Sequence, residues 1–163
     1  MNQKEIVLGR LKAMGFEPAE LGDLGYVFKY DGVSYLYMPD DDDEHFLRIV
    51  IPQLFDVTDE NRVAVLDAMH ETGLMLKYAK VCIMYEDAVW AVYEHRLNSY
   101  DNLSELLEHI IRVLEATAHV FCKKMNGEEV IGRSKDTEDC SDDELENELQ
   151  KMLDGIEEED ETN

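Results

Sequence analysis

The fold is decided by the stretch YVFKYDGVSYLYM, residues 26–38. Two runs rich in aromatic and β-branched residues flank Asp31-Gly32. This pattern is typical of a β-hairpin with a two-residue type I′ turn, in which both central residues have positive φ. Such a turn pairs Tyr30 with Val33, and one face of the hairpin is then almost wholly aromatic. The members of this aromatic face are Tyr26, Phe28, Tyr35 and Tyr37.

The aromatic face has two interpretations. It is either the core face of a sheet beneath helices, or an exposed groove for a segment of a partner protein. Tyrosine suits a partner groove because it combines a large apolar body with a polar tip. The sequence leaves both interpretations open.

Further elements on both sides of the hairpin complete an α+β pattern. Apolar residues at helical spacing predict helices over about 2–14, from Thr58 or Asp59 to about 72, and over about 102–125. A third strand is expected at 46–51, where Pro52 should end it. The predicted order is α-β-β-β-α-β-β-α, with an antiparallel sheet of about five strands.

A second hairpin is predicted from residues 75–85 and 88–95, turning at Glu86-Asp87. A two-residue turn would put Val81 opposite Val92 and Ile83 opposite Trp90. Both faces of this hairpin are apolar, so both should be covered. We take these four residues, together with the aromatic face, as the candidate protein-binding residues.

The helices carry different amounts of apolar surface. Val63, Leu66 and Met69 mark the predicted buried stripe of the central helix. The last helix has a broader apolar arc than one sheet requires. That breadth implies a second partner, which is another helix, a second subunit or the C-terminal tail.

Residues 126–163 read as an acidic linker and tail after a domain that spans 1–125. They hold 16 acidic and 3 basic residues. Ser141 to Glu144 has the pattern of a capping box. Leu145, Leu149, Met152 and Leu153 follow at helical spacing, which predicts a short helix near 142–153.

The formal net charge of −23 opposes binding to nucleic acid and to anionic membranes, because both are densely negative. Three well-separated cysteines do not suggest a disulfide framework. The N-terminus lacks the apolar core of a signal peptide, and no stretch is long and apolar enough to span a bilayer. We therefore expect a cytoplasmic protein.

Chemical motifs are absent from the sequence. The nearest metal-like pair is His119 with Cys122, and a zinc site needs two more ligands beside them. The acidic run 40–44 lacks the glycine and the spacing of an EF-hand loop. No nucleophile elbow and no phosphate-binding glycine loop occurs. The prediction is therefore no catalytic residue, no metal and no cofactor.

The element order resembles that of class I type III secretion chaperones and of the related YbjN-type bacterial sensory-transduction regulators. The resemblance covers about residues 2–125. It rests on the helix ending at Gly15-Phe16, the hairpin at Asp31-Gly32, the strand 46–51, the central helix, and the hairpin that leads into the long closing helix. It implies a non-enzymatic homodimer built around the central helix, with a partner polypeptide wrapped on the protomer surface.

The leading hypothesis is a dimeric, chaperone-like module that binds a protein partner on apolar and aromatic surface by strand addition or groove burial. A second hypothesis is a regulatory or sensory protein without chaperone activity, whose tail helix folds back on the last helix. A third is an enzyme with an unfamiliar carboxylate site.

Overall fold

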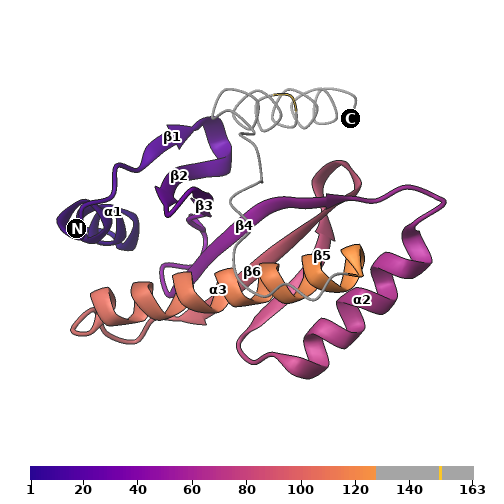
Figure 1. The fold of residues 1–163 in the computed structure, drawn as a ribbon. Helices are drawn as coiled ribbons and strands as arrows, with labels where there is room; N and C mark the ends of the chain where they lie inside the picture. Colours follow the sequence, from indigo (N-terminus) through magenta and orange to yellow (C-terminus); the bar gives the residue numbers. More distant parts are fainter. Residues whose placement is uncertain (128–150, 152–163) are drawn as a thin grey trace.

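The computed structural model describes residues 1–127 and residue 151. It confirms the α+β class, with an antiparallel sheet and three α-helices (Figure 1). The sheet has six strands in the order β1-β2-β3-β4-β6-β5. The strand that the sequence did not predict is β1 (Ala19–Leu21), which pairs with β2 at one edge. The predictions about residues 128–163, including the helix near 142–153, fall almost entirely outside the described residues.

The first helix, α1 (Gln3–Ala13), begins and ends as its sequence indicates. Asn2 caps it with a capping box in which the Asn2 side chain accepts from the Glu5 backbone N–H. Gly15 follows it with a φ of +94°, a conformation that glycine adopts readily. A short 3-10 turn, η1 (Gly22–Leu24), then leads from β1 into β2.

The first hairpin has the predicted register. Strands β2 (Gly25–Tyr30) and β3 (Val33–Tyr37) pair Tyr30 with Val33, Phe28 with Tyr35 and Tyr26 with Tyr37. Asp31 and Gly32 both have positive φ, as a type I′ turn requires. At its start, β2 needs Gly25, where a Cβ would collide with the carbonyl oxygen of Tyr37.

The prediction that Pro52 ends the third strand is wrong. Strand β4 (Phe46–Asp56) continues past it through a register irregularity between Ile51 and Phe55. Gln53 takes a φ of +57° within this irregularity. A bulge accommodates a residue that has no backbone N–H, so the strand bends there rather than stopping.

The predicted register of the second hairpin is wrong by one residue. Strands β5 (Ala79–Met84) and β6 (Ala88–Arg96) are joined by a three-residue turn, η2 (Tyr85–Asp87), in place of the two-residue turn that we expected. Val81 therefore pairs with Ala91 rather than Val92, and Ile83 pairs with Val89 rather than Trp90. Because side chains alternate along a strand, a slip of one residue moves partners to opposite faces.

The predicted buried stripe of the central helix is wrong for two of its three residues, since only Met69 packs against the core. Helix α2 (Arg62–Met75) buries Val65, Ala68 and Thr72, whereas Val63 and Leu66 face outward. Apolar residues occur on both sides of this helix, so periodicity alone did not identify the inner side.

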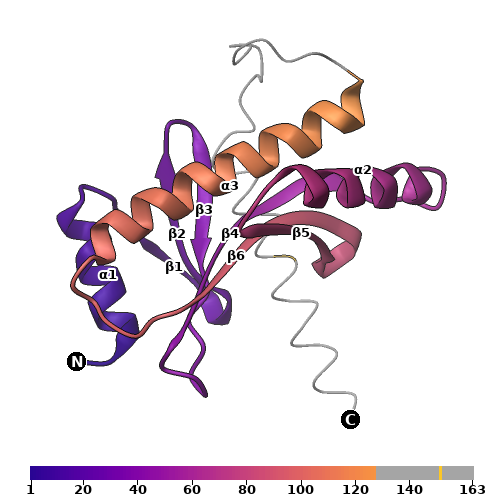
Figure 2. The ribbon, with the colours of Figure 1, turned by 90° about the horizontal axis from the view of Figure 1, so that it is seen from below.

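The last helix, α3 (Leu103–Asn126), is confirmed almost to the residue and ends at Gly127 in the left-handed conformation. It crosses one face of the sheet, with α1 beside its first turns and α2 beside its last (Figures 1 and 2). Its broad apolar arc therefore meets the sheet and these two helices. Of the partners that the arc implied, another helix is therefore present within the same chain, and it covers part of the arc.

The core divides between the two faces of the sheet. On one face, α1 and α3 pack over β2, β3, β4 and β6, and α2 packs with the end of α3 over β5, β6 and the end of β4. A separate cluster occupies the other face, and we call it the helix-free face because no α-helix of residues 1–127 contributes to it. Its buried members are Leu21, Leu24, Leu36, Met38, Val50, Ala88, Trp90 and Val92.

Candidate functional site

The aromatic face of the first hairpin lies in the core, which is one of the two interpretations left open by the sequence. Phe28, Tyr35 and Tyr37 are buried beneath α1 and α3, and Tyr26 is partly buried against the same cluster. The ring centroids of Phe28 and Tyr35 lie 5.5 Å apart in a stacked arrangement. Burial raises the pKa of the Tyr35 and Tyr37 hydroxyls above their usual value, so both stay protonated at neutral pH. These rings stabilise the core and are not accessible to a partner in this conformation.

The four candidate residues of the second hairpin do not form one surface. Trp90 and Val92 lie in the cluster of the helix-free face. Val81 and Ile83 are partly buried on the opposite face, against the cluster beneath α2 and the end of α3. Because the register slipped by one residue, the predicted set of Val81, Ile83, Trp90 and Val92 is divided between the two faces.

An apolar groove runs beside the second half of α3, and we call it the α3 groove. Its volume is about 620 Å³, which is in the range of sites that bind ligands or peptide side chains. The lining residues come from the start of β3, from β4 near its irregularity, and from α3. The lining apolar residues are Val33, Ile51, Leu54, Ala116, Ala118, Val120 and Cys122, and the polar ones are Arg112, Glu115 and His119.

A second hollow of about 490 Å³ lies on the other side of α3, towards α2. His119 and Val120 line both hollows, so this turn of α3 is a ridge between them. The Lys124 Nζ donates to Glu71 of α2 at 2.9 Å, which ties the end of α3 to α2. This hydrogen bond, followed by the charge of Lys124, holds the pKa of the Glu71 carboxyl below its usual value.

The outer side of α2 presents a row of exposed side chains that we call the α2 stripe. It consists of Val63, Leu66, His70 and Leu74, which share one side of the helix at spacings of three and four. Val63 is 72% exposed and Leu74 is 75% exposed. Large apolar side chains clustered in this way on an exposed surface commonly mark a protein interface.

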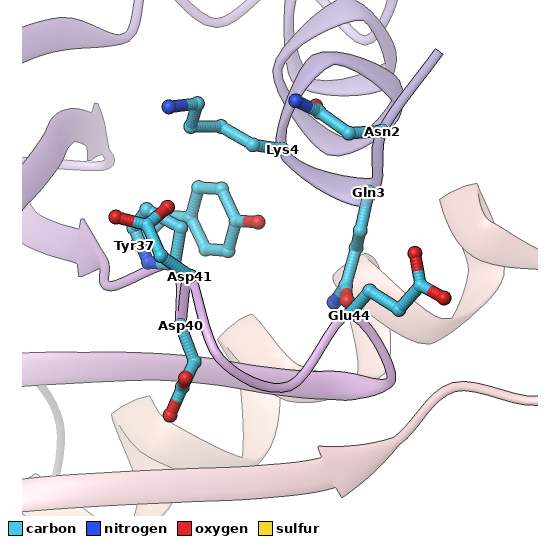
Figure 3. A pocket seen from close by; sticks show the side chains of 8 residues that line it. Asn2, Gln3, Lys4, Tyr37, Asp40, Asp41 and Glu44 are labelled. Carbon is cyan, nitrogen blue, oxygen red and sulfur yellow. The ribbon is translucent and has the colours of Figure 1, made fainter.

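A small cavity of about 160 Å³ lies between the start of α1 and the acidic loop 40–44 (Figure 3). The Asp40 carboxylate turns away from Lys4 and Tyr37 (Figure 3) and accepts from the backbone N–H groups of Asp42 and Asp43 at 2.9 and 3.1 Å. This carboxylate therefore stabilises the loop itself. Among the described residues, no group of three or more His, Cys, Asp or Glu side chains is placed to hold a metal ion.

The two described cysteines are poor nucleophiles. Burial raises the pKa of Cys122. Burial also raises the pKa of Cys82, and the nearby charges of Lys80 and Arg48 offset part of that rise. A thiol with a raised pKa is mostly protonated at neutral pH, and only the thiolate attacks. Cys122 therefore contributes to the α3 groove as a small apolar side chain.

Sequence reasoning missed the α3 groove and the outward orientation of the α2 stripe. The broad apolar arc of α3 was the available signal for the groove, because some of that arc stays only partly covered. Apart from Pro52, nothing in the sequence predicts the irregularity in β4 that places Leu54 at the groove.

Comparison with solved structures shows the same fold in two other proteins. The chain has a TM-score of 0.56 with YbjN from E. coli, described as a putative transcription regulator, at 12% identity over 76% of this chain and 91% of that one. It has a TM-score of 0.52 with an uncharacterized protein from Methanothermobacter thermautotrophicus, at 12% identity over 77% of this chain and 98% of the other. No family model matches the sequence, and no curated protein matches it either. The chain has a YbjN-type fold. No described helix is long and apolar enough to cross a membrane.

Proposed function

We propose that this chain is a non-enzymatic protein-binding module with a regulatory role, which holds an amphipathic helix of a partner protein in the α3 groove. The observation that carries the proposal is the groove itself, an open apolar hollow beside α3. A helix that buries its apolar side in a hydrophobic groove is a recurring mode of peptide recognition. The YbjN-type fold supports the regulatory role, since the E. coli protein with this fold is described as a putative transcription regulator.

The polar residues of the groove set the orientation of the partner. Arg112, Glu115 and His119 lie among the apolar lining residues. Such polar groups at the margin of an interface contribute to register and specificity more than to affinity. The apolar side chains of Leu54, Ala118 and Val120 would carry most of the binding energy, because they lose contact with water when a helix is bound.

We also propose that two protomers associate through the α2 stripe. The stripe leaves Val63 and Leu74 largely exposed in the single chain. In a symmetric dimer the stripe of one protomer would pack against the same stripe of the other, so each exposed side chain would be buried once in each protomer. This arrangement leaves the α3 groove of each protomer free for its partner.

Substitution of Val120 by Asp tests the groove. A charge on the ridge should weaken the binding of an amphipathic helix at least tenfold, because an unpaired carboxylate would be buried. The control is Asn102→Asp, which adds the same charge at an exposed position before α3. Binding is measured by fluorescence anisotropy with labelled amphipathic peptides selected from a displayed library. Equal affinity of both variants for every selected peptide would exclude the groove as the binding site.

A further inference from the structure

The helix-free face is buried although all three described helices lie on the other face of the sheet. Leu36, Val50 and Trp90 each have 0% of their surface exposed. A side chain in the middle of a sheet loses contact with water only when another layer packs above it, about 10 Å from the sheet. Leu21 and Leu24, from β1 and η1, cover one margin of this face. Among the described residues, the cluster on this face includes no α-helical residue.

The unpaired donor of Trp90 indicates what the missing layer carries. The Trp90 Nε1 is buried and has no hydrogen-bond acceptor among the described residues. Its nearest ring neighbour is Tyr85, at 5.5 Å between centroids. Buried N–H groups in folded proteins nearly always have an acceptor. The layer should therefore be rich in acceptors as well as apolar.

The charge of this face indicates the same chemistry. The strand register puts four basic and two acidic side chains on it, in a protein with a net charge of −23. The basic ones are Lys29, Arg48, Lys80 and Arg96, and the acidic ones are Asp56 and Glu94. Arg48 and Lys80 both bond to Glu94, at 2.9 and 2.6 Å. A locally positive surface on a strongly acidic chain favours an acidic occupant.

We propose that the acidic segment 142–153 of the same chain forms an amphipathic helix that covers the helix-free face. The segment has apolar side chains at Leu145, Leu149, Met152 and Leu153, and it follows the capping-box pattern at Ser141. Its other positions are mostly acidic, so it combines apolar side chains with many carboxylate acceptors. A helix of this length is about 18 Å long, enough to cross about four strands.

The connection to the described part of the chain is long enough for this arrangement. The segment 128–141 links the end of α3 at Gly127 to the proposed helix. Fourteen residues reach up to about 46 Å when extended. Layers on opposite faces of a sheet lie roughly 20 Å apart. The linker can therefore pass around a sheet edge from the α3 side to the helix-free face.

Trp90 makes the proposal testable, because it is the only tryptophan in the sequence and lies on this face. In the full-length chain, Leu149→Asp should release the segment, shift the tryptophan emission to longer wavelength and increase its quenching by acrylamide. The matched control is Asn147→Asp, which adds the same charge on the opposite side of the proposed helix and should change neither. An unchanged quenching constant in Leu149→Asp would overturn the proposal.

A second measurement identifies the occupant. A carbodiimide joins lysines to nearby carboxylates, and an equal mixture of ¹⁴N- and ¹⁵N-labelled full-length protein distinguishes links within a chain from links between chains. The proposal predicts links within one chain, from Lys80 or Lys29 to acids of the segment 142–153. If such links are found only between a ¹⁴N-labelled chain and a ¹⁵N-labelled chain, a second copy covers the face and the proposal is wrong. It is also wrong if these lysines form no link to that segment.

Discussion

The α2 stripe gives the sharpest quantitative prediction about assembly. Leu74 is 75% exposed in the single chain, so Leu74→Asp should leave the stability of the protomer nearly unchanged. Full burial of a leucine side chain contributes about 1.5–3 kcal/mol, so the exposed part of Leu74 would contribute about 1–2 kcal/mol on association. A symmetric interface contains the residue twice, which doubles the loss to about 2–4 kcal/mol.

This loss converts to a change in the dissociation constant of the dimer of about 30- to 700-fold, at 1.4 kcal/mol for each factor of ten. The assay is sedimentation velocity over a wide concentration range, with thermal unfolding in parallel to confirm that the protomer is intact. The control is Tyr30→Asp, which replaces another exposed apolar residue, 47% exposed at the end of β2, by the same charge. The reasoning is refuted if Leu74→Asp dimerises as tightly as the unchanged chain, or if the unchanged chain is a monomer throughout.

Three further predictions concern the body of the protein. Gly25→Ala should destabilise the fold by about 2 kcal/mol or more, because the φ of +144° at Gly25 and the close Tyr37 carbonyl both exclude a side chain. Gly9→Ala in α1, where no atom lies within 4 Å of the added Cβ, should stabilise the fold by about 1 kcal/mol. Chemical denaturation measures both free energies of unfolding. Partial burial raises the pKa of Glu94, but the hydrogen bonds from its two basic partners outweigh this and hold it below the usual value. The stabilisation from Glu94 should therefore be present at neutral pH and be lost as the pH falls through the lowered pKa. Glu94→Gln should lower the free energy of unfolding by about 1 kcal/mol at pH 7 and by little at pH 3, as measured by denaturation at both pH values. Cys122 and Cys82 should react with iodoacetamide more slowly than free cysteine at pH 7.5, because burial raises both pKa values. Mass spectrometry at timed intervals follows the reaction, and rates equal to that of free cysteine would contradict the expectation.

The sequence predicted the first hairpin to the residue because Asp31-Gly32 specifies one turn type. Both residues take the positive φ that a type I′ turn needs, and the turn type sets the pairing of every residue beyond it. The second hairpin has Glu86-Asp87 at the corresponding place. Both residues again have positive φ, but the turn includes Tyr85, which the sequence did not reveal. One extra residue in a turn was enough to divide the predicted binding residues between two faces.

The candidate site was less predictable than the fold because it depends on which apolar surfaces remain uncovered. In the sequence, the aromatic residues of the first hairpin and the exposed residues of α2 are both simply apolar residues at regular spacing. Tertiary packing buries Tyr35 and leaves Leu74 exposed. Helix α2 illustrates the difficulty, because apolar residues at helical spacing occur on both of its sides and only the packed structure shows that Val65 faces inward.

The most direct test of the account is the binding of displayed peptides to the unchanged chain and to its Val120→Asp variant. We predict that the unchanged chain enriches peptides with apolar residues at intervals of three and four, and that the same peptides bind the variant at least tenfold more weakly, because an unpaired carboxylate would be buried in the α3 groove. Asn102→Asp should bind them with unchanged affinity. Two results would contradict the claim that this protein works by holding a partner helix beside α3. One is a failure to enrich such peptides, and the other is equal binding of the peptides to the wild-type chain and to the Val120→Asp variant.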